Sequence, residues 1–443
     1  LFLRRDEDIA MLKRKIDEKL AAWKKKSNKL PLVIKGARQV GKTFSVRAFA
    51  KRNYKRFYEI NFFEKPSYCE IFNGSLRADD IVLKLSIEFK DFEIVPNDTL
   101  FFFDEIQFCP NARTALKFLS EKKDFDIIAS GSLLGLGYNM EKSIPLGYTE
   151  TIEMHSLDFE EFLWALDINS NIINKVKDCY NTKTKIDSSL HDRLMDIFKT
   201  YIVVGGMPAV VESYVSNNNF YSVNSIQRDI VSAYIDDIMK YADGAERMKA
   251  RSCFLSIPRQ LGKDYKKFQY SVVEKGGTCR KFGASLLWLY DAGIVSFCYN
   301  LSSLRLPLNG FAIESEFKVY MRDTGLLISM LDDGSAKDIL SGNMGIYKGA
   351  IYENIVADIF AKNGKKLYYF APSSTLEIDF VIRFEDRPTP VEVKSADNTK
   401  SKSLKTILSS EKYNIDKAIR LSSKNFGEEN SIYSIPLYAA FLL

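Results

Sequence analysis

The sequence predicts an α/β protein whose N-terminal part is built on a parallel sheet. Three observations predict it. Short apolar runs alternate with helix-like segments, which is typical of parallel sheets; the runs are residues 30–34, 57–61, 99–103 and 125–129. A glycine-containing turn at 36–43 lies between the first run and a helix-like segment. The third run ends in two carboxylates, Asp104 and Glu105.

Composition narrows the class of protein. The chain has 443 residues, of which 46% are hydrophobic and 27% charged, as in ordinary globular proteins. At about 150 residues per domain, this length predicts about three domains. The net charge of +6 is too small to indicate a nucleic-acid-binding protein by itself. Six widely spaced cysteines and two histidines argue against a zinc site and predict reduced thiols in a cytoplasmic protein.

The apolar stretches predict no contact with a membrane. The longest, at 437–443, is far shorter than the roughly 20 residues that span a bilayer, and we expect a buried terminal strand there. Charged residues from Arg4 to Asp8 leave no apolar core for an export signal at this end. A cytoplasmic location is therefore the expectation.

The turn after the first apolar run matches a phosphate-binding pattern. G-x-x-x-x-G-K-[ST] is met by Gly36, Ala37, Arg38, Gln39, Val40, Gly41, Lys42 and Thr43. Between a strand and a helix, such a turn can wrap nucleotide phosphates with backbone N–H groups at the positive end of the helix. We expect Lys42 to contact the β and γ phosphates of ATP and Thr43 to bind Mg²⁺. The alternative is a chance match, which the flanking strand and helix disfavour.

Polar residues at the ends of two other strands would complete this site. Asp104 is placed to bind Mg²⁺ through water, and Glu105 to orient and deprotonate an attacking water. Ser132 would lie beside the γ-phosphate. The alternative is that these strands merely end in polar residues, as many strands do. No arginine finger can be assigned, since a surface or structural role is the better expectation for Arg228.

Beyond residue 155 the pattern of helix-like and strand-like segments changes three times. These changes predict four regions: 1–165, 166–250, 251–335 and 336–443. The second is helical, with a break at Gly205-Gly206. In the third, a helix at 284–293 runs into a strand at 294–298, as in winged-helix domains. Its basic residues could contact DNA, dock on another region or face solvent; they are Arg251, Arg259, Lys263, Lys266, Lys267, Arg280 and Lys281.

The fourth region resembles the core of PD-(D/E)XK nucleases. The residues that carry the resemblance are Glu353, Asp379, Glu392 and Lys394. Glu392 and Lys394 are two apart, so both point to one face of a strand. Three carboxylates could hold Mg²⁺, while the lysine stabilises developing charge. The alternatives are an ordinary alternating strand, or a related fold that binds without cutting. Three further lysines could meet a phosphate backbone: Lys400, Lys402 and Lys405.

Over nearly its whole length the chain resembles a prokaryotic family of predicted AAA+-type P-loop ATPases. The segments that carry the resemblance include GARQVGKT, FFFDEIQ, IPLGYTETIEMHSLDFEEFL, VVGGMPAVV, RDTGLL, GAIYENIVADIF and PVEVKS. The resemblance implies ATP binding and hydrolysis and a winged-helix-like middle. It also implies a C-terminal domain of long-unknown function, and it supplies no substrate.

The function predicted is Mg²⁺-dependent hydrolysis of ATP to ADP and phosphate. Hydrolysis would drive rearrangement on a nucleic-acid partner, DNA or RNA, or on a protein partner. One alternative is an ATP-gated, metal-dependent nuclease. Another is a switch that binds ATP without hydrolysing it. A homo-oligomer, such as a ring, is also compatible with the resemblance.

Overall fold

The structure is a computed structural model that describes residues 12–132, 147–241, 244, 246–263, 267–343, 348–394 and 401–443. The chain forms two compact units. One unit comprises Leu1–Ser156 with Asp291–Gly293, and the other comprises Leu157–Tyr290 with Ile294–Leu443. Each unit is described by itself.

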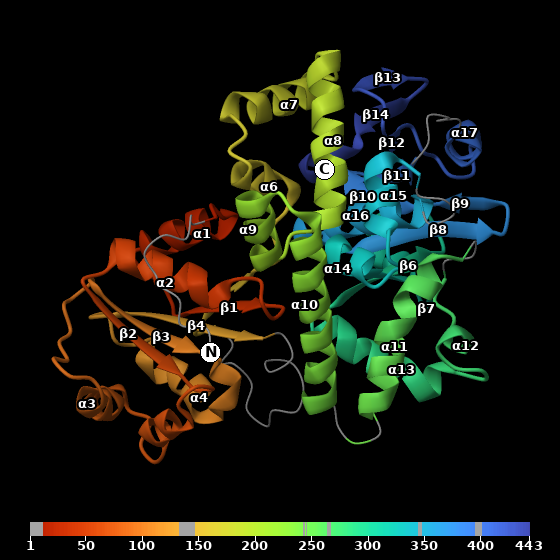
Figure 1. Ribbon diagram of the computed structural model, residues 1–443. Coiled ribbons are helices and arrows are strands. Elements are labelled where there is room, and N and C mark those ends of the chain that lie inside the picture. Colours follow the sequence, from red (N-terminus) through yellow and green to blue (C-terminus); the bar gives the residue numbers. More distant parts are fainter. Residues whose placement is uncertain are drawn as a thin grey trace. The chain divides into compact units, whose positions relative to one another are not determined.

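The first unit contains the predicted parallel sheet (Figure 1). Its strands are β1 (Leu32–Gly36), β2 (Arg56–Asn61), β3 (Thr99–Asp104), β4 (Asp126–Ser132) and β5 (Glu150–Glu153). They lie in the order β2-β3-β4-β1-β5, and every neighbouring pair is parallel. Parallel strands end at one edge of a sheet, so the ends of β1, β3 and β4 bring Gly36, Asp104 and Ser132 to the same edge.

Helices cover both faces of this sheet. Those of the first unit are α1 (Lys15–Lys24), α2 (Lys42–Asn53), η1 (Pro66–Phe72), α3 (Ala78–Glu88), η2 (Ile106–Phe108) and α4 (Pro110–Leu119). Leu32, Ile34 and Phe102 pack toward α1 and α2, while Val33 and Phe101 pack toward α3 and α4. Burial on both faces explains why these strands read as continuous apolar runs.

The N-terminal helix begins later than its apolar spacing suggests. Helical spacing starts at Ile9, but residues 1–11 lie outside the described part and the helix begins at Lys15. Arg14 precedes it with an extended backbone. Its guanidinium donates hydrogen bonds to the carbonyls of Val40 at 3.1 Å and His155 at 2.7 Å. These long-range bonds connect the start of the helix to the glycine-containing turn and to the segment after β5.

The second unit begins with helices, as predicted. These are α6 (Phe159–Ala165), α7 (Ser170–Thr182), α8 (Ser188–Val204), α9 (Pro208–Asn217) and α10 (Phe220–Tyr241). Next come α11 (Glu246–Leu261), α12 (Tyr270–Val273) and α13 (Cys279–Asp291). The remaining helices are α14 (Thr324–Ser329), α15 (Ser335–Ser341), α16 (Lys348–Lys362) and α17 (Lys402–Ser409), with the 3-10 helices η3 (Leu308–Phe311) and η5 (Leu437–Leu442).

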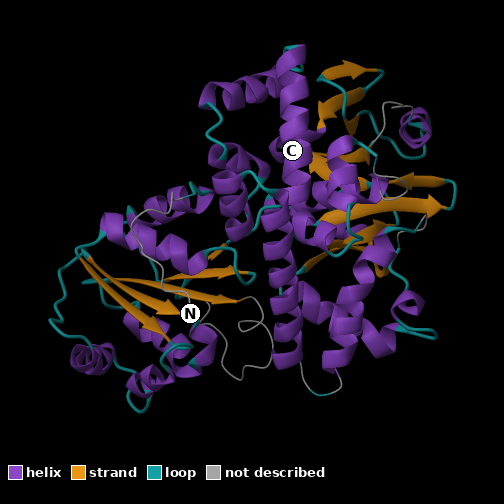
Figure 2. Cartoon of the chain, in the orientation of Figure 1, coloured by secondary structure: helices purple, strands orange, loops and turns teal. Residues whose placement is uncertain are grey.

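Two sheets complete the second unit (Figure 2). The first has the order β7-β6-β8-β9 and consists of β6 (Val295–Leu301), β7 (Ala312–Met321), β8 (Leu367–Ser373) and β9 (Leu376–Ile378). The second has the order β10-β11-β12-β14-β13 and consists of β10 (Phe380–Phe384), β11 (Arg387–Val393), β12 (Ala418–Ser422), β13 (Gly427–Glu429) and β14 (Ile432–Pro436). The predicted region boundary at 335/336 therefore falls between strands of one sheet.

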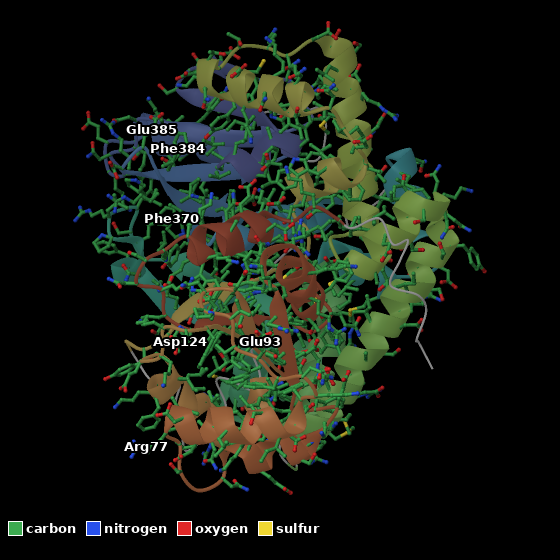
Figure 3. All side chains as sticks on the ribbon, turned by 90° about the vertical axis from the view of Figure 1, so that its left-hand side faces the viewer. Arg77, Glu93, Asp124, Phe370, Phe384 and Glu385 are labelled. Atoms are coloured by element: carbon green, nitrogen blue, oxygen red, sulfur yellow. The ribbon has the colours of Figure 1, made fainter. Side chains whose placement is uncertain are left out.

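The C-terminal core joins elements that are distant in sequence. Phe370 on β8, labelled in Figure 3, packs edge-on against Tyr413 with ring centroids 5.6 Å apart. Figure 3 also labels Phe384 and Glu385, where β10 ends and the backbone turns through a positive φ of 48° at Glu385.

Two expectations for the second unit need correction. The apolar pattern of residues 377–383 predicts one strand, but the run is split between β9 and β10 at Asp379. The terminal run is not a strand but the buried 3-10 helix η5. Periodicity cannot distinguish strand from helix in so short an apolar run. No helix among the described residues is both long and apolar enough to cross a bilayer.

Candidate nucleotide-binding site

The glycine-containing turn joins β1 directly to α2. Gln39 and Gly41 have positive φ angles of 64° and 96°, and α2 begins immediately after Gly41. A side chain at Gly36 is not tolerated, because an added Cβ would lie 2.3 Å from the carbonyl oxygen of Met154. These backbone requirements explain the two glycines of the pattern.

Lys42 is folded back onto this turn. Its ammonium donates hydrogen bonds to the carbonyls of Gly36 at 3.0 Å and Ala37 at 2.8 Å. Burial lowers the pKa of Lys42 to about 8, although Glu105 and Asp104 oppose that shift. Lys42 is therefore a buried ammonium within the turn, and its pKa lies below the ordinary value for lysine.

Asp104 is the centre of a hydrogen-bond network at the sheet edge. Its carboxylate accepts bonds from Thr43 Oγ1 at 2.9 Å and from Asn61 Nδ2 at 3.2 Å. Ser130 Oγ and the backbone N–H of Glu105 also donate to it. Burial raises the pKa of Asp104, while the Ser130 and Thr43 hydroxyls act in the opposite direction. Thr43 and Asp104, predicted separately from the sequence, are in direct contact.

Glu105 has an unusual backbone and a neighbour that sequence reasoning missed. Its φ is 53°, in the left-handed region. Gln107 donates a hydrogen bond from Nε2 to Glu105 Oε2, and the same nitrogen lies 3.5 Å from Ser132 Oγ. Within the described part of the chain, Gln107 Oε1 is buried without a hydrogen-bond partner. Gln107 thus connects the two predicted residues, Glu105 and Ser132.

Asn61 was not predicted as a site residue, whereas Ser130 lies in the polar end of β4, 130–132, where a residue beside the γ-phosphate was expected. Asn61 ends β2, and its side-chain oxygen accepts the backbone N–H groups of Phe63 and Glu64, both at 3.0 Å. That leaves its amide nitrogen to hold Asp104. The signal that could have identified them is their position at the ends of strands neighbouring β3.

The donor set fits a nucleoside triphosphate with Mg²⁺. No described side chain caps the first turn of α2, so its backbone N–H groups face the turn. One ammonium, one hydroxyl and one buried carboxylate lie together beside it. These are the groups that phosphate oxygens and a hydrated Mg²⁺ require.

The C-terminal constellation is brought together only in part. Asp379 lies between β9 and β10, and its Oδ2 accepts the backbone N–H of Val393 at 2.8 Å. Glu392 is buried and forms an ion pair with Lys394, and Ser401 Oγ also donates to it. Burial raises the pKa of Glu392, against the effect of Lys394. Glu353 Oε2 accepts a 3.2 Å hydrogen bond from Tyr320 Oη.

A lysine that the sequence did not indicate lies close to Glu353 and to a further carboxylate, Glu377. Lys318 on β7 is 1% exposed, with its ammonium 2.5 Å from Glu377 Oε1 and 3.8 Å from Glu353 Oε2. No group of three or more His, Cys, Asp or Glu that could hold a metal occurs within the described ranges. The residues present therefore do not fit the three-carboxylate Mg²⁺ site expected from the nuclease resemblance.

The basic residues of the middle region are partly engaged. Lys267 forms an ion pair with Glu316 at 2.8 Å, and Lys281 with Glu274 at 2.6 Å. Arg228 forms an exposed ion pair with Asp333, consistent with the surface role expected for it. Lys266 and Lys400 lie outside the described residues.

Three family models match successive parts of the chain. Residues 28–163 match the model described as an AAA domain. Residues 195–337 and 348–439 match two models described as domains of unknown function, DUF8612 and DUF4143. No curated protein matches the chain significantly.

Solved structures that match the chain include a Walker-type ATPase, paby2304, of Pyrococcus abyssi. It is 12% identical, covers 72% of this chain and 96% of its own, and has a TM-score of 0.43. The Aeropyrum pernix ORC1 protein in complex with DNA is 13% identical over 74% and 90% of the two chains, with a TM-score of 0.31. Residues 28–163, which contain the glycine-containing turn, are similar to the AAA-domain family.

Proposed function

We propose that this protein binds ATP with Mg²⁺ and hydrolyses it to ADP and phosphate. The observation that carries the proposal is the 2.9 Å contact between Thr43 of the glycine-containing turn and Asp104 at the end of β3. This contact joins two sequence motifs 61 residues apart at one sheet edge. A structural strand end would not need a hydroxyl from that turn.

Each residue then has a defined task. Backbone N–H groups of 36–43 hold the phosphates, and Lys42 exchanges its two carbonyl partners for phosphate oxygens. Thr43 and Asp104, the latter through water, would hold Mg²⁺, which neutralises phosphate charge when bound. Glu105 orients the attacking water and accepts its proton, and Ser132 contacts the γ-phosphate. Glu105 must therefore leave the amide of Gln107 or carry it along.

The test compares two variants that affect different steps. Lys42→Ala should lose most of its ATP affinity in isothermal titration calorimetry. Glu105→Gln should keep that affinity but lose about 100-fold or more in turnover, the usual contribution of a positioned general base. Lys51→Ala, at the exposed end of α2, is the matched control and should behave like the wild type. Unchanged ATP affinity in Lys42→Ala would contradict the proposal.

The same measurements separate the switch alternative. A non-hydrolysing switch would bind ATP tightly and show no turnover, and Glu105→Gln would then change nothing. The nuclease alternative, with Glu353, Asp379, Glu392 and Lys394, stays a prediction. It requires cleavage of plasmid or single-stranded DNA with Mg²⁺ or Mn²⁺ that is lost in Asp379→Ala or Lys394→Ala.

We also propose that hydrolysis drives rearrangement on a DNA, RNA or protein partner, through a winged-helix-like region at 251–335. The order α11, α12, α13, then the antiparallel pair β6–β7, supports that region. The helical region 166–250, the region 336–443 and a homo-oligomer stay predictions. Light scattering of Glu105→Gln with ATP would test oligomerisation.

A further inference from the structure

Arg14 is a buried residue at the start of α1 that reaches the glycine-containing turn. Only 6% of the residue is exposed. Its Nη1 donates a hydrogen bond to the carbonyl oxygen of Val40 at 3.1 Å, and its Nη2 donates to the carbonyl oxygen of His155 at 2.7 Å. One planar guanidinium, whose donor directions are fixed, thereby holds two carbonyl groups from distant segments of the first unit.

The segment that contains His155 gives Arg14 a fixed position. The backbone N–H of Met154 donates to the carbonyl of Lys35 at 2.7 Å, so this segment extends the pairing of β5 with β1. The carbonyl of Met154 also lies against Gly36, the last residue of β1. Arg14 is therefore anchored to backbone that is itself fixed on the strand from which the turn starts.

The hydrogen bond to Val40 orients a peptide group inside the turn. Because the peptide bond is planar and trans, the C=O of Val40 and the N–H of Gly41 point in opposite directions. A carbonyl directed at Arg14 therefore directs the Gly41 N–H away from it. Since α2 begins immediately after Gly41, this N–H belongs to the group at the positive end of the helix that can bind phosphate oxygens.

The backbone of the turn needs such support. Val40 lies between Gln39 and Gly41, whose φ angles are 64° and 96°. A positive φ is unfavourable for a residue with a side chain, such as Gln39, and persists where the surrounding structure enforces it. Rotation of the peptide group between Val40 and Gly41 would point a carbonyl oxygen where the N–H had been, and it would break the hydrogen bond to Arg14.

We propose that Arg14 is a positioning residue for phosphate binding, which holds the turn in the conformation that accepts a polyphosphate. It acts through the peptide group between Val40 and Gly41 and does not itself contact the ligand. Arg14 has this role only if the turn binds ATP as proposed above. A purely structural role would instead lower the stability of the first unit without a selective loss of phosphate affinity.

The experiment measures the affinity of the full-length protein for ATP and for inorganic tripolyphosphate by isothermal titration calorimetry. Tripolyphosphate has no base or ribose, so its affinity reports on phosphate binding alone. The variant is Arg14→Met, which removes both donors and keeps much of the side-chain volume. Arg52→Met is the matched control, since Arg52 also donates to a carbonyl, that of Ala48 at 3.1 Å, but is exposed.

We expect Arg14→Met to bind ATP and tripolyphosphate each about tenfold more weakly than the wild type and Arg52→Met, the effect of losing a hydrogen bond made by a charged group. Equal affinities in Arg14→Met and the wild type would overturn this role of Arg14 and leave the proposed ATP binding intact. A loss confined to ATP would also overturn it, because Arg14 would then act on the base or ribose. A wild type that binds neither ligand would contradict the proposed function, and the role of Arg14 with it.

Chemical rescue separates positioning from a loss of folding. Arg14→Ala leaves space in which methylguanidinium can donate to the same two carbonyls. Added methylguanidinium should restore most of the tripolyphosphate affinity of Arg14→Ala, at a temperature at which circular dichroism shows this variant to be folded. It should leave the wild type and Lys42→Ala unchanged. A folded Arg14→Ala that methylguanidinium does not rescue would overturn the proposal.

Discussion

At the scale of single residues, the protonation of Lys42 should couple the proposed ATP binding to pH. Its pKa in the free protein is about 8 because the side chain is buried. Triphosphate oxygens favour the charged ammonium and should raise this pKa in the complex. A group whose pKa rises on binding takes up a proton, so affinity should fall as pH increases from about 8 to 10.

Calorimetry checks this first prediction. At pH 8.5, the apparent binding enthalpy of ATP should depend on the ionisation enthalpy of the buffer and report net proton uptake. Lys42→Arg stays charged at this pH and should show no such dependence. A wild-type enthalpy that is the same in every buffer would contradict the assignment.

Gln107 leads to a second prediction, which depends on the proposed hydrolysis. Its amide holds Glu105 beside Ser132, so Gln107→Ala should leave Glu105 less well positioned. We expect kcat to fall about tenfold or more while KM for ATP changes little. Gln107→Glu should place a second carboxylate beside Glu105, raise the pKa of Glu105 and move the acidic limb of the kcat profile to higher pH. A change in KM alone would contradict a positioning role.

At the scale of elements, the family segments without evident chemistry have a structural role. The break between α8 and α9 contains Gly206, whose N–H donates to Asp323 Oδ2 at 2.8 Å. Its carbonyl accepts the N–H of Leu157 at 2.6 Å. An added Cβ on Gly206 would lie 2.0 Å from the Leu157 carbonyl oxygen. The VVGGMP and RDTGLL segments therefore hold three parts of the second unit together: the Leu157 segment, the turn between α8 and α9, and the start of α14.

Gly206→Ala should accordingly destabilise the second unit by about 1–3 kcal/mol, as forced overpacking does. Gly349→Ala is the control, because a Cβ there would meet nothing within 4 Å and alanine favours the helix. Urea unfolding of both variants checks the prediction. If Gly206→Ala and Gly349→Ala had the same free energy of unfolding, the segment around Leu157 would be able to move away from the added methyl group.

A buried ion pair in α16 is the second element-scale feature. Lys362 lies 2.8 Å from Asp358 and donates to the Leu157 carbonyl at 3.0 Å and to Tyr201 Oη at 3.2 Å. Burial raises the pKa of Asp358 to about 7, against the opposing effect of Lys362. Without the lysine, the carboxyl group would have to stay protonated in the folded protein.

Lys362→Met should therefore cost about 3–5 kcal/mol, the usual effect of breaking a buried pair. The folded protein would then bind a proton that the unfolded chain releases above about pH 4. The unfolding free energy of this variant should consequently fall as pH rises from 5 to 7. Adding Asp358→Asn to Lys362→Met should remove that pH dependence. If the pH dependence persists in the double variant, a group other than Asp358 causes it.

At the scale of the whole molecule, the chain contains separate cores. The clusters around Phe101 and Leu32 belong to the first unit, and the cluster around Phe370 belongs to the second. Since ADP with Mg²⁺ would bind only the first unit, it should raise one of two thermal transitions. At 100 times its Kd, the ligand should stabilise that unit by about 2.7 kcal/mol.

Differential scanning calorimetry with and without ADP and Mg²⁺ tests this prediction. In Lys42→Ala both transitions should remain, and neither should respond to ADP. A single transition that moves as a whole would show that the two cores unfold together.

The sequence by itself determined the parallel α/β core and the phosphate-binding turn. Both depend on local patterns, namely apolar runs buried on two faces and glycines that permit positive φ angles. The contact of Thr43 with Asp104 could be anticipated because parallel strands end at one edge. The terminal run at 437–443 could not be assigned, because a short apolar segment fits a strand or a helix equally well.

Only the tertiary structure decided which side chains meet across distant elements. Gln107 reaches Glu105 and Ser132 through a short 3-10 turn that has no sequence period of its own. Lys318 on β7 contacts Glu377 on β9, although the two strands lie in different predicted regions and are not neighbours in their sheet. Local patterning specifies strands and turns, but strand order and the pairing of buried charges depend on contacts between residues far apart in the chain.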